Sequence, residues 1–123
     1  MADRLERLEK LNEKLARLRE LKKKIEQRIK KERALAIRYA KEIAFWFLEA
    51  TGEPEAEQKG KVYEITLKYL ESSLCKRAKH KRRCLEKKLK LVLEYKSEFK
   101  KVHLVAKRLL YHMENSEKKE TES

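Results

Sequence analysis

Two cysteines enclose the most cationic stretch of this 123-residue sequence, Cys75-Lys76-Arg77-Ala78-Lys79-His80-Lys81-Arg82-Arg83-Cys84. Six of its eight inner residues are Lys or Arg, and it joins two segments with helical periodicity. The stretch lacks Gly, Pro, Asn and Asp, so a continuous helix is one alternative. On such a helix the two cysteines would lie ~13.5 Å apart on opposite faces. A helical hairpin would let them face each other, and we therefore expect a turn.

The N-terminal part of the chain carries an apolar seam of the coiled-coil type. Its apolar residues recur at alternating steps of three and four, interrupted only at Lys22. This is the a and d spacing of a heptad pattern, and it predicts a helix whose apolar face needs a partner. We expect a homodimer through this Leu8–Ile29 seam, or pairing with the chain's own third helix. The seam consists of Leu8, Leu11, Leu15, Leu18, Ile25 and Ile29.

The apolar pattern changes at Ala34, after which apolar residues cover more than one face of the predicted helix. Thr51-Gly52 followed by Pro54 predicts the helix end, because Gly adopts the left-handed conformation easily and Pro cannot continue a helix. The first helix is therefore predicted over about residues 3–50. Residues 1–33 are expected to form a coiled-coil arm, and residues 34–114 a helical bundle.

Two further helices are expected. Pro54 with its neighbouring glutamates favours a helix start, and the apolar stripe from Tyr63 to Leu74 predicts a second helix over about 54–77. A stripe from Leu85 to Met113 predicts a third over about 84–114, continuous with the second in the alternative without a turn. Residues 115–123 are polar and predict a disordered tail.

The overall composition agrees with an all-α fold. Charged residues make up 45% of the chain and Gly and Pro together number only three, which is typical of long helices and coiled coils and disfavours strand-rich folds. We expect a single elongated domain, a helical bundle or coiled coil of three long helices. The chain has one Asp, two Asn and two Gln beside abundant Lys and Glu, a bias expected of a hyperthermophile proteome.

The net charge of +13 indicates a polyanionic partner, because a positive field attracts nucleic acid, anionic lipid or acidic protein. If the second helix returns antiparallel to the first, a basic run in the first helix lies beside the cysteine-flanked stretch. The two runs would then form one patch. Its expected nucleic-acid-binding residues are Lys22, Lys23, Lys24, Arg28, Lys30, Lys31, Lys76, Arg77, Lys79, Lys81, Arg82 and Arg83.

No motif that reads base edges accompanies this patch, so phosphate contacts are expected rather than sequence readout. The sequence predicts largely sequence-independent binding to the backbone of DNA or RNA. The alternatives are a structural or adaptor coiled-coil protein that recruits an acidic protein, a basic amphipathic helix on an anionic membrane, and a merely solvated surface. A basic run followed by heptads also has the polarity of a bZIP protein, but the base-contacting asparagine of such regions is missing.

Catalytic and metal chemistry are not expected. Cys75, His80 and Cys84 could supply metal ligands, but their spacing matches none of the usual zinc patterns, and we expect no metal or cofactor. No nucleophile has a base and an orienting carboxylate nearby in sequence, which predicts a protein that is not an enzyme. The two cysteines are expected as free buried thiols or as a disulfide, which hyperthermophile cells permit.

The location is expected to be intracellular, in the cytoplasm. No apolar signal region follows Met1. The most apolar window, residues 43–48, is far shorter than the ~20 residues of a membrane-spanning helix.

Overall fold

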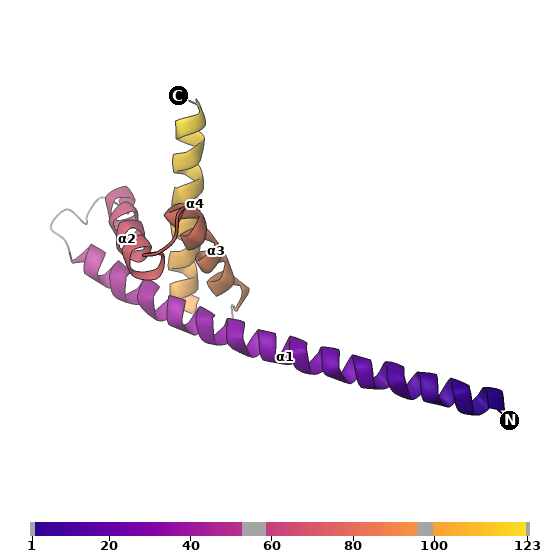
Figure 1. The fold of residues 1–123 in the computed structure, drawn as a ribbon. Helices are drawn as coiled ribbons and strands as arrows, with labels where there is room; N and C mark the ends of the chain where they lie inside the picture. Colours follow the sequence, from indigo (N-terminus) through magenta and orange to yellow (C-terminus); the bar gives the residue numbers. More distant parts are fainter. Residues whose placement is uncertain (1, 53–58, 96–99, 123) are drawn as a thin grey trace. The chain divides into compact units, whose positions relative to one another are not determined.

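The computed structural model describes residues 2–52, 59–95 and 100–122, and these form four α-helices (Figure 1). The helices are α1 (Ala2–Thr51), α2 (Lys59–Leu74), α3 (Lys81–Glu94) and α4 (Lys100–Glu122). None of the described residues forms a strand, so the prediction of an all-α fold is confirmed. The prediction of three long helices is wrong, because the third is divided into α3 and α4.

The chain divides into two compact units, Met1–Arg33 and Ala34–Ser123. The division falls where the apolar pattern of the sequence changes from the heptad seam to the segment that begins at Ala34. The first unit is the N-terminal part of α1, and the second unit contains the remainder of α1 with α2, α3 and α4.

The first unit leaves its apolar seam in contact with water. Every described side chain from residue 3 to residue 31 is exposed. The six seam residues from Leu8 to Ile29 retain between 48% and 60% of their accessible surface. About half of each of these apolar side chains is thus available to a partner, and the homodimer stays a prediction.

The helix ends of α1 and α2 agree with the predictions in part. Thr51 closes α1, and the Gly52 N–H donates to the carbonyl oxygens of Leu48 and Glu49, each at 3.2 Å. Gly52 does not have the left-handed conformation expected of it, since no described glycine has a positive φ. The predicted helix start at Pro54 lies outside the described residues.

The expected turn between the two cysteines is confirmed. α2 ends at Leu74, and residues 75–80 form no helix. The Ala78 N–H donates to the Cys75 carbonyl at 3.1 Å, a tight turn, and the Cys84 N–H donates to His80 at 3.1 Å to start α3. A continuous helix would have placed like charges three and four residues apart along the whole stretch, which is unfavourable.

The break after Glu94 corrects the predicted third helix. The Tyr95 N–H donates to the Val92 carbonyl at 3.3 Å, and Tyr95 has φ −104° and ψ 59°, outside the helical region. The apolar stripe is in phase across residues 85–113, so the sequence pattern alone favoured one helix. In the structure the apolar residues of α3 pack against those of α4, so that both sets are buried. α4 continues to Glu122, past the helix end predicted at residue 114.

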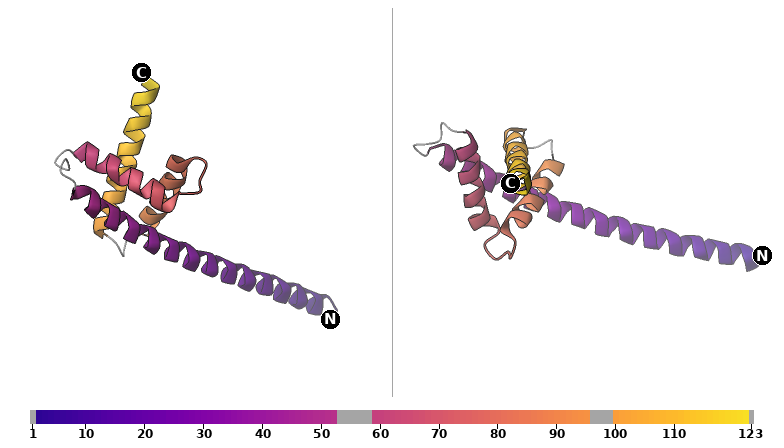
Figure 2. Two further views of the ribbon diagram at one scale, coloured as in Figure 1. Left: turned by 60° about the vertical axis from the view of Figure 1, so that its left-hand side comes forward. Right: turned by 90° about the horizontal axis from the view of Figure 1, so that it is seen from above.

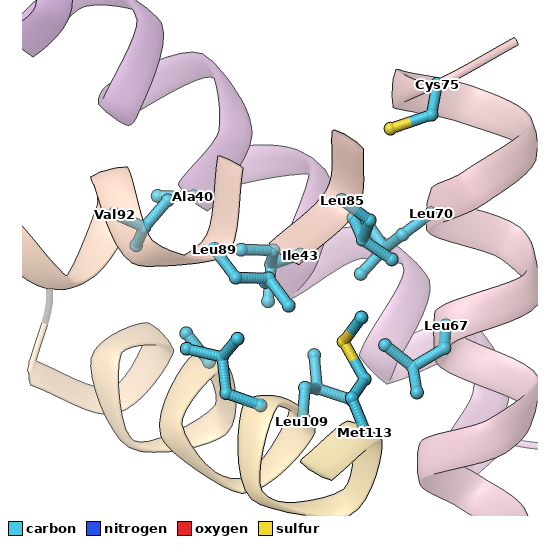
Figure 3. Close-up of a cluster of buried hydrophobic side chains, with 12 residues drawn as sticks. Ala40, Ile43, Leu67, Leu70, Cys75, Leu85, Leu89, Val92, Leu109 and Met113 are labelled. Atoms are coloured by element: carbon cyan, nitrogen blue, oxygen red, sulfur yellow. The ribbon is translucent and has the colours of Figure 1, made fainter. Parts of the chain in front are cut away.

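The core of the second unit lies among all four helices (Figure 3). Ile43 of α1, Leu67 and Leu70 of α2, Leu85 and Leu89 of α3, and Leu109 of α4 have no accessible surface. Each fully buried Leu or Ile contributes about 1.5–3 kcal/mol relative to exposure, so this cluster is the main source of stability. Viewed from above, α2 and α3 form a V that opens from the 75–80 turn, with α4 seen along its axis between the arms (Figure 2).

The aromatic segment of α1 attaches α2. The ring centroids of Trp46 and Tyr69 lie 4.9 Å apart, and the Trp46 Nε1–H and the Ser73 hydroxyl both donate to Oε2 of Glu42, at 2.9 and 2.8 Å. Phe45, next to Trp46 in α1, remains half exposed. In the part of the chain that the structure describes, no helical stretch has the length and apolarity of a membrane span.

Candidate functional site

The predicted nucleic-acid-binding residues lie in both units. Lys22, Lys23, Lys24, Arg28, Lys30 and Lys31 are exposed on the first unit, and the Arg28 Nε lies 3.2 Å from Oε1 of Glu32. In the second unit, Lys76, Arg77 and Lys79 are exposed in the turn, and Lys81, Arg82 and Arg83 form the first turn of α3. Because the two runs belong to different units, their union in one patch stays a prediction.

A cationic groove lies beside the turn in the second unit. It has a volume of about 610 Å³ and extends from the turn along α3 to Tyr39 of α1. Four of its lining residues are Lys or Arg, and no carboxylate is found among the described residues that line it. The lining residues are Tyr39, Lys79, His80, Arg83, Cys84, Lys87, Lys88 and Leu91.

Three of the four cations are available for binding. Lys79, Arg83 and Lys87 are exposed, and none of them forms an ion pair with a described residue. Lys88 is different, because its Nζ donates to the Leu74 carbonyl and lies 5.1 Å from the centre of the Tyr39 ring. Lys88 therefore packs into the groove wall, while the other three side chains are exposed and make no ion pair with the part of the chain that the structure describes.

The start of α3 adds positive potential at the same place. The amide N–H groups of a first helical turn have no intrahelical acceptor and carry the positive end of the helix dipole. The N-cap residue His80 makes no side-chain cap, and the first turn contains no acidic residue. Carboxylates usually stabilise this end, yet Lys81, Arg82 and Arg83 occupy it. An anion bound here would offset that repulsion.

Arg82 has a structural position rather than a free one. Its Nη2 lies 2.5 Å from Oε1 of Glu64, and its Nε lies 2.5 Å from Oε1 of Glu71, a contact that lacks hydrogen-bond geometry. The Nε2 of His112 donates to the other oxygen of Glu64 at 3.0 Å. Partial burial raises the pKa of Glu64, but the His112 hydrogen bond and the Arg82 charge outweigh it and lower that pKa. This network joins α2, α3 and α4, so Arg82 is expected to contribute less to ligand binding than its neighbours.

The two cysteines lie together at the base of the turn. Both are free thiols; Cys75 is buried in the core and Cys84 is half buried at the groove. Burial, together with a hydrogen bond to Cys84, raises the pKa of the Cys75 thiol to about 12. Among the described residues, no group of three or more His, Cys, Asp and Glu could hold a metal ion. A disulfide between Cys75 and Cys84 stays a prediction, and it can be tested because the two thiols lie within hydrogen-bond distance of each other.

The raised pKa predicts unequal thiol reactivity. At pH 8, iodoacetamide should alkylate Cys84 and leave Cys75 unmodified in the native protein, since only the thiolate reacts and Cys75 stays protonated below about pH 12. Mass spectrometry after brief labelling measures both sites, and denatured protein serves as the control in which both react. Equal native labelling would contradict the buried position of Cys75, and no labelling of either residue before reduction would indicate the disulfide.

Sequence reasoning missed Lys87, Lys88 and Tyr39. Lys87 follows Arg83 by four residues, so the helical spacing placed the two cations on one face and could have identified Lys87. Tyr39 lies far away in sequence and reaches the groove only through packing of α1 against α3, for which the sequence pattern contains no signal.

Comparison with known proteins adds no assignment: no protein-family model, no curated protein and no solved structure matches this chain.

Proposed function

We propose that this chain is a non-enzymatic protein that binds the phosphate backbone of DNA or RNA with little sequence preference, through the cationic groove of the second unit. The observation that carries the proposal is the groove wall itself. Lys79, Arg83 and Lys87 project from it without ion-pair partners among the described residues, and no described carboxylate lines it. Uncompensated cations at one concave place favour a polyanion over a solvated surface.

The chemistry of the wall fits phosphate better than base edges. Lys and Arg bind phosphate oxygens, and a tyrosine hydroxyl such as that of Tyr39 can donate to the same atoms. The unsatisfied amides at the start of α3 favour the same ligand. Asn and Gln, the side chains that pair with adenine in the major groove, are not among the described residues that line this site. Binding is therefore expected to depend on charge and little on sequence.

The basic run of the first unit extends the proposal. Lys22, Lys23 and Lys24 are exposed, as are Lys30 and Lys31 about two turns further along the helix. These side chains can contact further phosphates of a long duplex. Substitutions in the first-unit run and in the groove, made separately and together, show from the loss of duplex affinity whether the two groups of cations act as one surface.

A salt titration tests the proposal against the alternative of an adaptor that recruits an acidic protein. Each phosphate that the protein neutralises releases counterions, so the logarithm of the duplex affinity should fall linearly with the logarithm of salt concentration, with a slope of about −0.9 per phosphate contacted. We expect a slope of roughly −3 or steeper from the three groove cations, measured with duplexes of unrelated sequence. Absence of binding at ~100 mM salt would favour the adaptor.

A further inference from the structure

The exposed seam of the first unit and the residues beside it indicate what kind of partner it binds. The heptad assignment places Leu8, Leu15 and Ile29 at position a, together with Lys22, and Leu11, Leu18 and Ile25 at position d. The stripe at a and d has the spacing of a coiled-coil contact, and Leu5 at e and Leu21 at g broaden it. A helix that lies on a membrane commonly carries aromatic residues on its apolar face, and residues 2–33 contain none. The heptad spacing without aromatic residues therefore favours a helix as the occupant.

The charges beside the seam have one sign. Positions e and g border the contact and form the ion pairs that set partner choice in coiled coils. In residues 5–33 they hold five cations, one carboxylate and three uncharged residues. Three further glutamates lie on the opposite face at position f, while Glu9 lies at b and Glu32 at d. The flanking charges are Arg7, Lys14, Arg19, Glu26, Arg28 and Arg33, and the outer glutamates are Glu6, Glu13 and Glu20.

A second copy of this chain fits the flanks poorly. In a parallel pair, position g of one helix faces the next e of the other, which places Lys14 against Arg19 and Arg28 against Arg33. Lys22 would also face its own copy in the apolar contact. In an antiparallel pair, g faces g and e faces e. The three charged g residues are all cations, and among the e residues only Glu26 offers the opposite charge, to Arg19 or Arg33. Because most of the facing charges repel, the homodimer expected from the seam alone has little electrostatic support.

We propose that the seam docks a helix of another protein that carries apolar residues at a and d and Glu or Asp at e and g, with a carboxylate opposite Lys22. Charge complementarity along both flanks selects this partner, and a single charged a position fixes the register of the two helices. The Arg28–Glu32 pair within α1 does not block docking, because Arg28 is 82% exposed and free to turn to the partner. The inference uses the first unit alone and does not rest on nucleic-acid binding.

The test uses the full chain and two synthetic four-heptad peptides. Both peptides have Leu at a and d apart from Glu opposite Lys22; one has Glu at e and g, the other Lys. We expect the Glu peptide to bind roughly 100-fold more tightly at low salt, because five flanking cations attract it and repel the Lys peptide, while Glu26 alone has the opposite preference. Isothermal titration calorimetry measures both affinities, and circular dichroism reports the helicity of the complex.

Two variants make the test specific. The first variant reverses the charge at four e and g positions, with Arg7→Glu, Lys14→Glu, Arg19→Glu and Arg28→Glu. This variant should bind the Lys peptide more tightly than the Glu peptide. The matched control changes the net charge equally at position c, with Lys10→Glu, Arg17→Glu, Lys24→Glu and Lys31→Glu, and should keep the preference for the Glu peptide. All eight side chains are exposed, so both variants are expected to fold.

Three results would overturn the inference. Equal affinity for the two peptides, or equal effects of the two variants, would mean that the flanks do not select the partner. Sedimentation of the chain alone as a dimer at micromolar concentration, abolished by Leu15→Glu with Leu18→Glu, would make a second copy the occupant. Binding to phosphatidylglycerol vesicles that the same leucine variant abolishes, without peptide binding, would assign the seam to a membrane surface.

Discussion

Replacing Lys79, Arg83 and Lys87 together by Gln is expected to weaken binding to duplex DNA about 100-fold. In the proposed complex each of these exposed cations makes one contact with a phosphate, and a net contribution of about 1 kcal/mol per contact gives about 3 kcal/mol in total. The slope of affinity against salt should become shallower by roughly 2.7, since three phosphates are no longer neutralised. Fluorescence anisotropy with labelled duplexes of several sequences measures both quantities.

A matched variant controls for net charge. Lys68→Gln, Lys101→Gln and Arg108→Gln remove the same number of Lys and Arg charges from exposed positions of α2 and α4 that do not line the groove. This control should change the affinity by only a few-fold. Equal losses from the two variants would mean that attraction is diffuse. Replacing Lys22, Lys23 and Lys24 by Gln then measures whether the first unit adds contacts of its own.

Leu89→Ala is expected to lower the free energy of unfolding of the second unit by about 2–5 kcal/mol. Leu89 has no accessible surface and lies in the core among side chains from all four helices (Figure 3). The substitution removes buried apolar surface and leaves a cavity that the surrounding helices fill only partly. Trp46, the only tryptophan, belongs to this unit, so its fluorescence during denaturant unfolding reports the loss.

Leu104→Ala provides the comparison for the core prediction. Leu104 lies on α4 and is 49% exposed, so the same chemical change should alter the free energy of unfolding by no more than about 0.5 kcal/mol. Equal unfolding midpoints for the two alanine variants would contradict the burial of Leu89 between α3 and α4. They would also contradict the break after Glu94, because this break allows α4 to pack against α3.

Part of the fold was predictable from local sequence. The all-helical composition and the cysteine spacing indicated helices with a turn at residues 75–80. The break at Tyr95 was not predictable in this way. No Gly or Pro marks it, and the apolar stripe continues in phase, so the reason for the break is the long-range gain from folding α4 onto α3.

The candidate site was predictable only in part. The dense positive charge between the cysteines led to Lys79 and Arg83 as predicted binding residues, because the density of charge along the chain can be read directly from the sequence. The position of Arg82 between Glu64 and Glu71 depends on how α2 and α3 pack, and so does the contact of Lys88 with Tyr39. Sequence charge therefore indicated the cationic groove now proposed as the site, and tertiary packing determines which of its cations make contacts within the described part of the chain.

Lysine acetylation footprinting with and without duplex DNA tests the proposed site most directly. Lys79 and Lys87 should lose reactivity when DNA is bound at ~100 mM salt, because phosphate contacts engage their amines. Lys68, exposed on α2 and outside the groove, should react equally in both samples. Mass spectrometry quantifies each site in one experiment. Protection of Lys79 and Lys87 beside an unchanged Lys68 is the predicted result, and equal reactivity of all three with DNA bound would contradict binding through the groove.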